Sequence, residues 1–322
     1  MKVWKKLLKC LEAGRPAVLL VVAESSGSSP GRPGFKMMVG SGGMLAGSVG
    51  GGSMENIIIE QARCMLHEGA GNPLLRKLIH SEKASPEDRS GMICAGSQGI
   101  VLCPCHPGDL PVIRRIIEAY DRRGGTFHIS TTGLEFSAEH SGDDHLLVTD
   151  GYDWSYREKI ATPDTVFIFG GGHCSLALCK ILATLDMKSV VIDDREDVRT
   201  MDANTYAARK HVMPYCDVSE LVPDDGTAFV VIMTASHRAD GIVLKQMLEK
   251  RLRYLGMLAS RAKGKALLEQ LGKEGFREDL LALVHTPIGL PISSHSPAEI
   301  AVSIAAEIIK IKFTKGTIQK YY

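Results

Sequence analysis

The stretch that decides the fold is Val166-Phe-Ile-Phe-Gly-Gly-Gly-His-Cys-Ser175. Its apolar start predicts a buried strand over 166–169, and a helical pattern over 174–185 follows the glycines. The segment matches the G-x-G-x-x-G fingerprint, with Ser175 in place of the third glycine. Glycine permits the tight turn and lets backbone N–H groups approach a phosphate at the helix N-terminus. The stretch therefore predicts a phosphate-binding cleft, with a purely structural glycine turn as the alternative.

An acidic residue follows at the spacing that a nucleotide site requires. Asp193 ends the next predicted strand, 189–192, and comes 21 residues after Gly172 (193 − 172 = 21). An acid about 20 residues beyond the glycines binds a ribose hydroxyl in dinucleotide-binding folds. The cleft would hold a nucleotide or a pterin phosphate. Its candidate binding residues are Gly170, Gly172, His173, Ser175, Asp193 and Arg195.

The rest of the second half alternates short apolar runs with helical patterns. This order is typical of an α/β fold with a doubly wound, Rossmann-like parallel sheet. Ser296-Pro-Ala-Glu299 adds a capping box with proline at the first helical position, which marks the start of a last helix. The predicted strands are 228–233, 254–257 and 281–285, and the predicted helices are 240–251, 260–271 and a final one from 297.

The first half is predicted to be α+β. A helix over 4–13 and a strand over 17–23 precede the glycine-rich tract, and a helix is expected from about 54 to 66. The polar segment Ser155–Asp164 is the predicted linker. We expect an N-terminal domain over 1–155 and a Rossmann-like domain over 156–322.

A second glycine cluster lies in the first half, where residues 25–54 contain ten of the chain's 33 glycines. Gly47-Ser-Val-Gly-Gly-Gly-Ser-Met-Glu55 leads from a predicted strand into a helix and is a second candidate anion site, with Ser53 as the expected N-cap. The upstream loop 27–34 is either a ligand loop or a flexible linker. The candidate residues of this half are Ser28, Ser29, Gly50, Gly51, Gly52, Ser53 and Glu55.

Composition excludes several classes of protein. The 38 basic and 37 acidic residues balance to +1, which gives no reason to expect nucleic-acid binding. The longest apolar run, 17–23, is far shorter than a membrane span, and no secretory signal is apparent. With only eight cysteines, a cytoplasmic location is expected. Cys94 is either a ligand-facing thiol or a core cysteine; no metal site and no catalytic constellation can be assigned.

In combination, the motifs resemble the xanthine dehydrogenase accessory factor (XdhC/CoxI) family over nearly the whole chain. The departures include Ser53, where some relatives carry cysteine, and Ala95 within Cys94-Ala-Gly96. The matching motifs are Gly27-Ser-Ser-Pro30, Gly34-x-Lys-Met37, Gly47–Gly52 with Glu55, Cys94-Ala-Gly96, Phe169–His173, Asp193-Asp-Arg195, Tyr254–Met257 with Ser260-Arg261, Pro287–Leu290 and Ser296–Glu307.

The resemblance implies an XdhC/CoxI-type N-terminal domain and a Rossmann-like C-terminal domain. It also implies a maturation factor that binds molybdenum cofactor (molybdopterin), assists its sulfuration with a cysteine desulfurase and inserts it into an apo molybdenum hydroxylase of the xanthine dehydrogenase type. A homodimer is expected on the same ground. The alternative is an NAD(P)-dependent oxidoreductase that uses the Gly170–Ser175 turn and Asp193.

Overall fold

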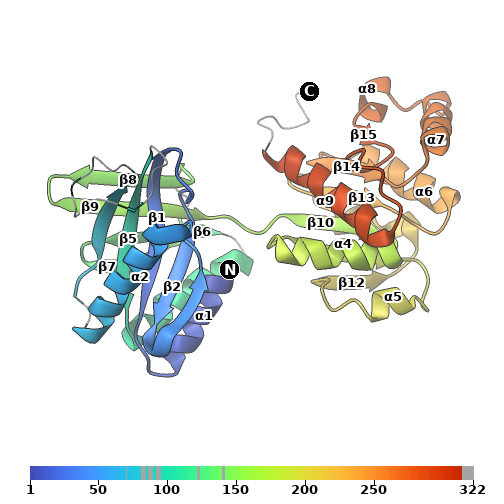
Figure 1. Ribbon diagram of the computed structural model, residues 1–322. Coiled ribbons are helices and arrows are strands. Elements are labelled where there is room, and N and C mark those ends of the chain that lie inside the picture. Colours follow the sequence, from blue (N-terminus) through green and yellow to red (C-terminus); the bar gives the residue numbers. More distant parts are fainter. Residues whose placement is uncertain are drawn as a thin grey trace. The chain divides into compact units, whose positions relative to one another are not determined.

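Figure 1 shows a computed structural model that describes residues 1–69, 71–80, 85, 90–91, 96–121, 124–139 and 142–313. The chain forms two compact units, Met1–Thr162 and Pro163–Tyr322. The first unit contains α1 (Lys2–Glu12), β1 (Ala17–Gly27), β2 (Lys36–Gly40), β3 (Met44–Gly47), α2 (Gly52–His67), β4 (Leu74–Ile79), β5 (Gly96–Cys105), α3 (Leu110–Asp121), β6 (Gly125–Ser130), β7 (Gly133–Ser137), β8 (His145–Asp150) and β9 (Asp153–Ile160).

The second unit has the alternation of strands and helices that its sequence predicts, except that the predicted strand 281–285 forms only at 284–285, because Leu281 ends a short helix that begins at Glu278. It contains β10 (Thr165–Phe169), α4 (His173–Thr184), β11 (Lys188–Asp193), α5 (Arg199–Asp202), β12 (Arg209–Val212), β13 (Phe229–Ile232), α6 (His237–Leu248), β14 (Tyr254–Met257), α7 (Arg261–Lys273), α8 (Glu278–Leu281), β15 (Val284–His285) and α9 (Pro297–Phe313).

The sheet of the second unit confirms the predicted doubly wound fold. Its six strands are ordered β12-β11-β10-β13-β14-β15, and every pair is parallel. The order reverses between β10 and β13, which is the switch point where such sheets bind ligands. Phe169 pairs with both Ile192 and Ile232, so β11, β10 and β13 end level with one another. The loops that follow these three strands therefore begin side by side.

Helices cover both faces of this sheet, as alternate strand residues require (Figure 1). On one face, Val166 and Ile168 pack with Leu178 of α4 and Ile304 of α9. On the other, Phe167 and Phe169 belong to the core that includes α6 and α7. The predicted capping box of α9 is confirmed, because the Ser296 and Glu299 side chains accept each other's backbone N–H groups at 3.3 and 2.9 Å.

The first unit is built from two antiparallel sheets, ordered β3-β2-β1-β5-β4 and β7-β6-β9-β8. The face of the first sheet that carries Val18 and Leu20 packs against α2. Its opposite face shares a core with α1, α3 and the second sheet, where Trp4, Phe127 and Tyr156 are buried. This arrangement confirms the α+β architecture expected for the first half.

A buried ion pair connects the two sheets of the first unit. Lys36 of β2 places its Nζ 2.5 and 2.8 Å from the carboxylate oxygens of Glu158 on β9, and both side chains are at most 10% exposed. The Tyr156 hydroxyl donates to Glu158 Oε2 at 2.8 Å, and Lys36 also donates to the Gly34 carbonyl. Each charge is thus satisfied inside the core, as a buried pair requires.

The predicted linker Ser155–Asp164 is wrong over its first part. Residues 153–160 form β9, whose buried positions alternate as Trp154, Tyr156, Glu158 and Ile160. The alternation is hard to see in the sequence, because one of the inward positions is Glu158, the glutamate that pairs with Lys36. Strand β4 lacks strong alternation, and the sequence pattern does not predict it.

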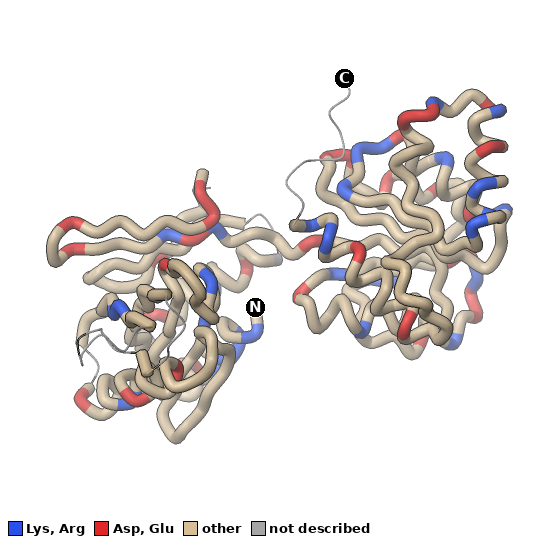
Figure 2. Tube along the Cα trace, turned by 45° about the horizontal axis from the view of Figure 1, so that its top comes forward, with Lys and Arg blue, Asp and Glu red and all other residues tan. Residues whose placement is uncertain are grey.

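Surface charge is mixed on both units, with Lys and Arg interspersed among Asp and Glu (Figure 2). Within the described residues, no helix has both the length and the apolar character that crossing a membrane requires.

Candidate functional site

The glycine turn of the second unit lies at the switch point of the parallel sheet. Gly170 follows β10 with φ +112°, and a Cβ there would lie 2.2 Å from the Met233 carbonyl oxygen at the end of β13. Glycine is therefore required both by the backbone conformation and by the close approach of the neighbouring loop. The contact places the turn directly beside Thr234, which begins the loop after β13.

The turn opens helix α4 with unused hydrogen-bond donors. Gly172 is the N-cap with φ −71°, and a Cβ there would meet no atom within 4 Å. Among the described residues, no hydrogen bond involves the backbone N–H groups of Gly172, His173 or Cys174. His173 is exposed beside them, whereas Ser175 is fully buried. Free N–H groups at a helix N-terminus are the donors that anions bind in proteins, so this turn is the candidate anion site of the second unit.

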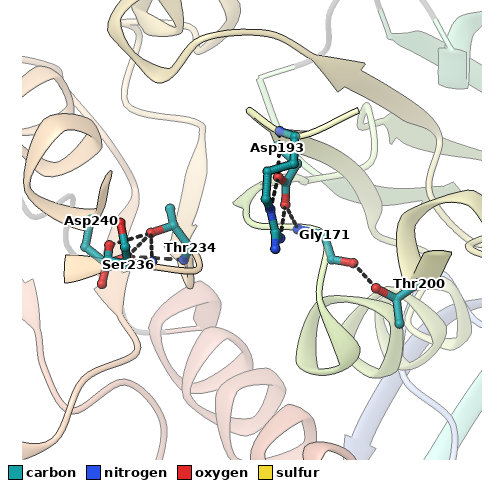
Figure 3. Close-up of polar contacts among 7 residues, drawn as sticks. Gly171, Asp193, Thr200, Thr234, Ser236 and Asp240 are labelled. Atoms are coloured by element: carbon teal, nitrogen blue, oxygen red, sulfur yellow. Dashed lines mark hydrogen bonds and ion pairs between the residues drawn. The ribbon is translucent and has the colours of Figure 1, made fainter. Parts of the chain in front are cut away.

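Asp193 supports this turn from the end of β11 (Figure 3). Its side chain is fully buried, and Oδ2 accepts the Gly171 N–H at 2.7 Å and Arg195 Nη2 at 2.9 Å. Oδ1 accepts Arg195 Nε and the Arg195 backbone N–H. Burial alone raises the pKa of Asp193, but these hydrogen bonds bring it below its usual value. The carboxylate is therefore ionised, and all of its lone pairs are engaged within the chain.

The first turn of α6 contributes a second acid, Asp240, which is buried and bonds back to the loop after β13 (Figure 3). Asp240 Oδ1 accepts the Thr234 hydroxyl at 2.6 Å and the Thr234 N–H at 3.1 Å. Burial raises the pKa of Asp240, against the effect of these two bonds. Ser236 caps α6 by accepting the Ala239 N–H, and His237 Nδ1 lies 3.9 Å from Asp240 Oδ2. His237 is thereby held at the exposed start of the helix.

Glu307 of α9 organises the far end of the same sheet. It accepts the Tyr254 hydroxyl, His285 Nδ1 at 3.0 Å and the Gly289 N–H at 2.8 Å. Burial opposes ionisation, yet the bonds from His285 and Tyr254 keep the pKa of Glu307 below its usual value. The family motifs around Tyr254, Gly289 and Glu307 thus meet in one structural cluster, which the sequence did not predict.

The glycine loop of the first unit has already bound a carboxylate of its own chain. Glu55, in the first turn of α2, accepts at Oε2 the Ser48 hydroxyl at 2.6 Å, the Val49 N–H at 2.9 Å and the Gly51 N–H at 3.0 Å. Burial raises the pKa of Glu55, but these donors lower it overall. The predicted N-cap Ser53 is wrong: Gly51, with φ +77°, is the N-cap and α2 starts at Gly52.

The remaining predicted residues of the first unit have different environments. Ser53 Oγ donates to the Ser90 carbonyl at 3.1 Å, and Ser28 is exposed. Ser29 is buried and donates to the Ser97 carbonyl at 2.9 Å, which makes it a structural residue. Gly50 donates to Ser48 Oγ at 3.1 Å. Cys94 lies outside the described residues, so its candidate role stays a prediction.

Two buried polar residues that the sequence did not single out lie beneath this loop. Gln98 of β5 accepts the Gly31 N–H at Oε1 and donates from Nε2 to the Val49 carbonyl. It therefore ties the upstream loop to the glycine loop. His80 is fully buried with Nδ1 2.7 Å from Ser90 Oγ, and burial lowers its pKa. His80 directly follows β4, and Gln98 lies within β5. A polar residue at such a position is the sequence signal that could have identified both.

Comparison with protein-family models gives a match in each unit. The model of the XdhC and CoxI family matches residues 10–76, and the XdhC Rossmann domain matches residues 166–308. The chain belongs to the XdhC and CoxI family. The Rossmann match covers the glycine turn, Asp193 and Glu307.

Two curated proteins resemble this XdhC and CoxI family chain along most of its length. It is 26% identical to the uncharacterized protein YqeB of Escherichia coli K12 over 97% of the chain, and spans 46% of that protein, about half its length. It is 24% identical to a protein of Bacillus subtilis named as a probable xanthine dehydrogenase subunit, over 94% of this chain and 95% of that one.

A solved structure shares the fold. The crystal structure described as a xanthine dehydrogenase from Bacillus halodurans matches with a TM-score of 0.77 over 99% of this chain and 98% of that chain. The sequences are 22% identical, so the likeness supports the fold and nothing finer.

Proposed function

We propose that the chain is an accessory factor for a molybdenum hydroxylase of the xanthine dehydrogenase type. In this role it binds molybdopterin-type cofactor, assists its sulfuration together with a cysteine desulfurase, and inserts it into the apoenzyme as a homodimer. Family membership and the name of the Bacillus subtilis relative support the association with such an enzyme. The cofactor supplies the client's metal centre; this chain's residues bind, hold and release it.

The observation that carries the cofactor-binding proposal is the open start of α4. The N–H groups of Gly172, His173 and Cys174 are unused within the described residues, and the space in front of Gly172 is free. A phosphate fits this chemistry because it is an anion with several acceptor oxygens. Thr234, in the adjoining loop, would border the bound group. Reversible binding needs such donors and no proton-transfer residue, which agrees with a delivery role.

The alternative, an NAD(P)-dependent oxidoreductase, requires Asp193 as a ribose ligand. That carboxylate is fully buried and already accepts bonds from Gly171 and Arg195. A ribose hydroxyl would find no free lone pair on it. We therefore prefer the accessory-factor proposal, in which Asp193 holds the turn and does not contact the ligand.

Retention of pterin by the purified protein tests this proposal. The chain is purified from a molybdenum-replete host, denatured and oxidised, and pterin fluorescence is measured. We expect fluorescence from the wild type and its loss in Gly172→Val, whose side chain would occupy the open space without backbone strain. Gly108→Val is the matched control, because that glycine also has free space and an ordinary φ. A wild type that neither retains nor binds molybdopterin, yet titrates with NADH, contradicts the proposal.

A further inference from the structure

A groove between α6 and α7 is lined by none of the residues of the glycine turn and is unexplained by the proposed function. It has a volume of 660 Å³, within the ~300–1,000 Å³ range of small-molecule sites. Arg238 and Lys245 line it from α6, and Lys263 from α7. None of the described residues that line it is Asp or Glu. Ile242 and Leu267 give it an apolar lining, and Leu267 lies against Gly241 where the two helices approach each other.

The cations of this groove are placed where a helix alone disfavours them. Arg238 is the second residue of α6 and Lys263 the third of α7, and the first turn of α7 has no acidic residue. The positive end of the helix dipole repels such cations. Within the described part of the chain, neither Arg238 nor Lys263 has an ion-pair partner, whereas Lys245 pairs with Glu274 at 2.5 Å. The groove therefore concentrates positive charge from two side chains without ion-pair partners and from the start of α7, whereas the first turn of α6 contains the buried Asp240.

We infer that the groove binds a phosphorylated small molecule of nucleotide size. Its phosphates would lie between Arg238 and Lys263, where guanidinium and ammonium groups donate to phosphate oxygens. Its planar or apolar part would cover Ile242, a side chain left 37% exposed. An acidic protein segment would pair with the positive charges but would leave the apolar lining of the groove uncovered. This inference does not depend on the proposed cofactor delivery.

Calorimetric titration of the full chain with ADP and with pyrophosphate tests the site. We expect the wild type to bind ADP, and the Arg238→Gln/Lys263→Gln variant to bind at least about tenfold more weakly. Lys265→Gln is the matched control, since this lysine is on α7, pairs with Glu269 and does not line the groove. Ile242→Asn should weaken the binding of ADP and leave the binding of pyrophosphate unchanged. Gly172→Val should leave both affinities unchanged, because Gly172 does not line the groove.

Thermal unfolding without ligand gives a second readout. Removing both cations should raise the Tm by about 1 to 4 °C, because they oppose the helix dipoles. A fall in Tm would make them structural and overturn the inference. The inference also fails if ADP does not bind at about 1 mM, if the double variant binds as the wild type does, or if only a polyglutamate peptide binds. Loss of ADP binding in Gly172→Val would assign the nucleotide to the switch point instead.

Discussion

The Gly47–Ser53 loop and the Gly170–Ser175 turn both lead from a strand into a helix through three consecutive glycines. In each, a carboxylate of the chain accepts backbone N–H groups of the glycines. In the first unit the acid is Glu55, from the helix that the loop begins, and it accepts the N–H groups of Val49 and of the N-cap residue Gly51. In the second unit the acid is Asp193, from the neighbouring strand, and the start of α4 stays free. The two acids thus engage different donors: Glu55 takes the N–H of the N-cap residue of its helix, whereas Asp193 takes the N–H one residue before the N-cap Gly172.

Gly170→Ala should have the largest effect, because it forces a methyl group against the Met233 carbonyl at a φ of +112°. We expect the free energy of unfolding to fall by about 3 kcal/mol or more. Urea unfolding of the full chain measures this, with Gly108→Ala as the control. A loss below about 1 kcal/mol would contradict this expectation, because it would show that the turn accepts a side chain at Gly170 as readily as the control position Gly108 does.

Asp193→Asn should reduce the free energy of unfolding by about 2–3 kcal/mol, since it weakens charged hydrogen bonds to Gly171 and Arg195. The Arg195 side chain is 49% exposed, so solvent screens its ion pair with Asp193, and we count only part of the energy of that pair. The pKa of Asp193 is below its usual 3.8 in the folded state, so this stabilisation is complete above pH 3.8 and is lost as pH falls through the lowered pKa. Urea titrations at several pH values should show wild type and variant converging in acid. A gap independent of pH would contradict this assignment.

Glu55→Ala should cost less, about 1 kcal/mol, because the carboxylate caps a half-exposed helix end. Its folded-state pKa is lowered, so the stabilisation is present above pH 4.5 and disappears as pH falls below it. Glu60→Ala is the control, since Glu60 is on the same helix and forms an exposed pair with Arg63. If Glu55→Ala gained molybdopterin retention, the vacated loop of the first unit would be a competing site.

Gly172→Ala should have the smallest effect on stability, within about 0.5 kcal/mol. The methyl group would point into open space at an ordinary φ. The expected consequence is reduced pterin retention at unchanged Tm, measured on the same sample. A clear loss of stability would show that this glycine is as constrained as Gly170.

The second unit is predicted well from its sequence because most of its strands are short apolar runs that alternate with helical patterns. The predicted strand Tyr254–Met257 agrees to the residue, and α9 begins at its proline. The first unit is harder to predict, since its sheets are antiparallel and partly polar. The strand over 153–160 resembles a linker in sequence because an inward glutamate conceals its alternation.

The sites show the same limit of sequence reasoning. Spacing identifies Asp193 as an important acid, but spacing does not reveal that Arg195 folds back and occupies its oxygens. Likewise, three glycines before a helix predict anion binding, and only the structure identifies the anion in the first unit as Glu55. Which donors are already used depends on contacts between separate segments, and the sequence does not encode these locally.

The ion pair between Lys36 and Glu158 sets a lower limit on the piece of chain that can fold by itself. The segment that matches the XdhC and CoxI family model, 10–76, contains Lys36 but lacks both Glu158 and β5, the central partner of β1. A fragment cut to the matched residues would bury an unpaired ammonium group and leave β1 as an open edge. The autonomous module is therefore larger than the recognisable motif, and it ends only with β9 at Ile160.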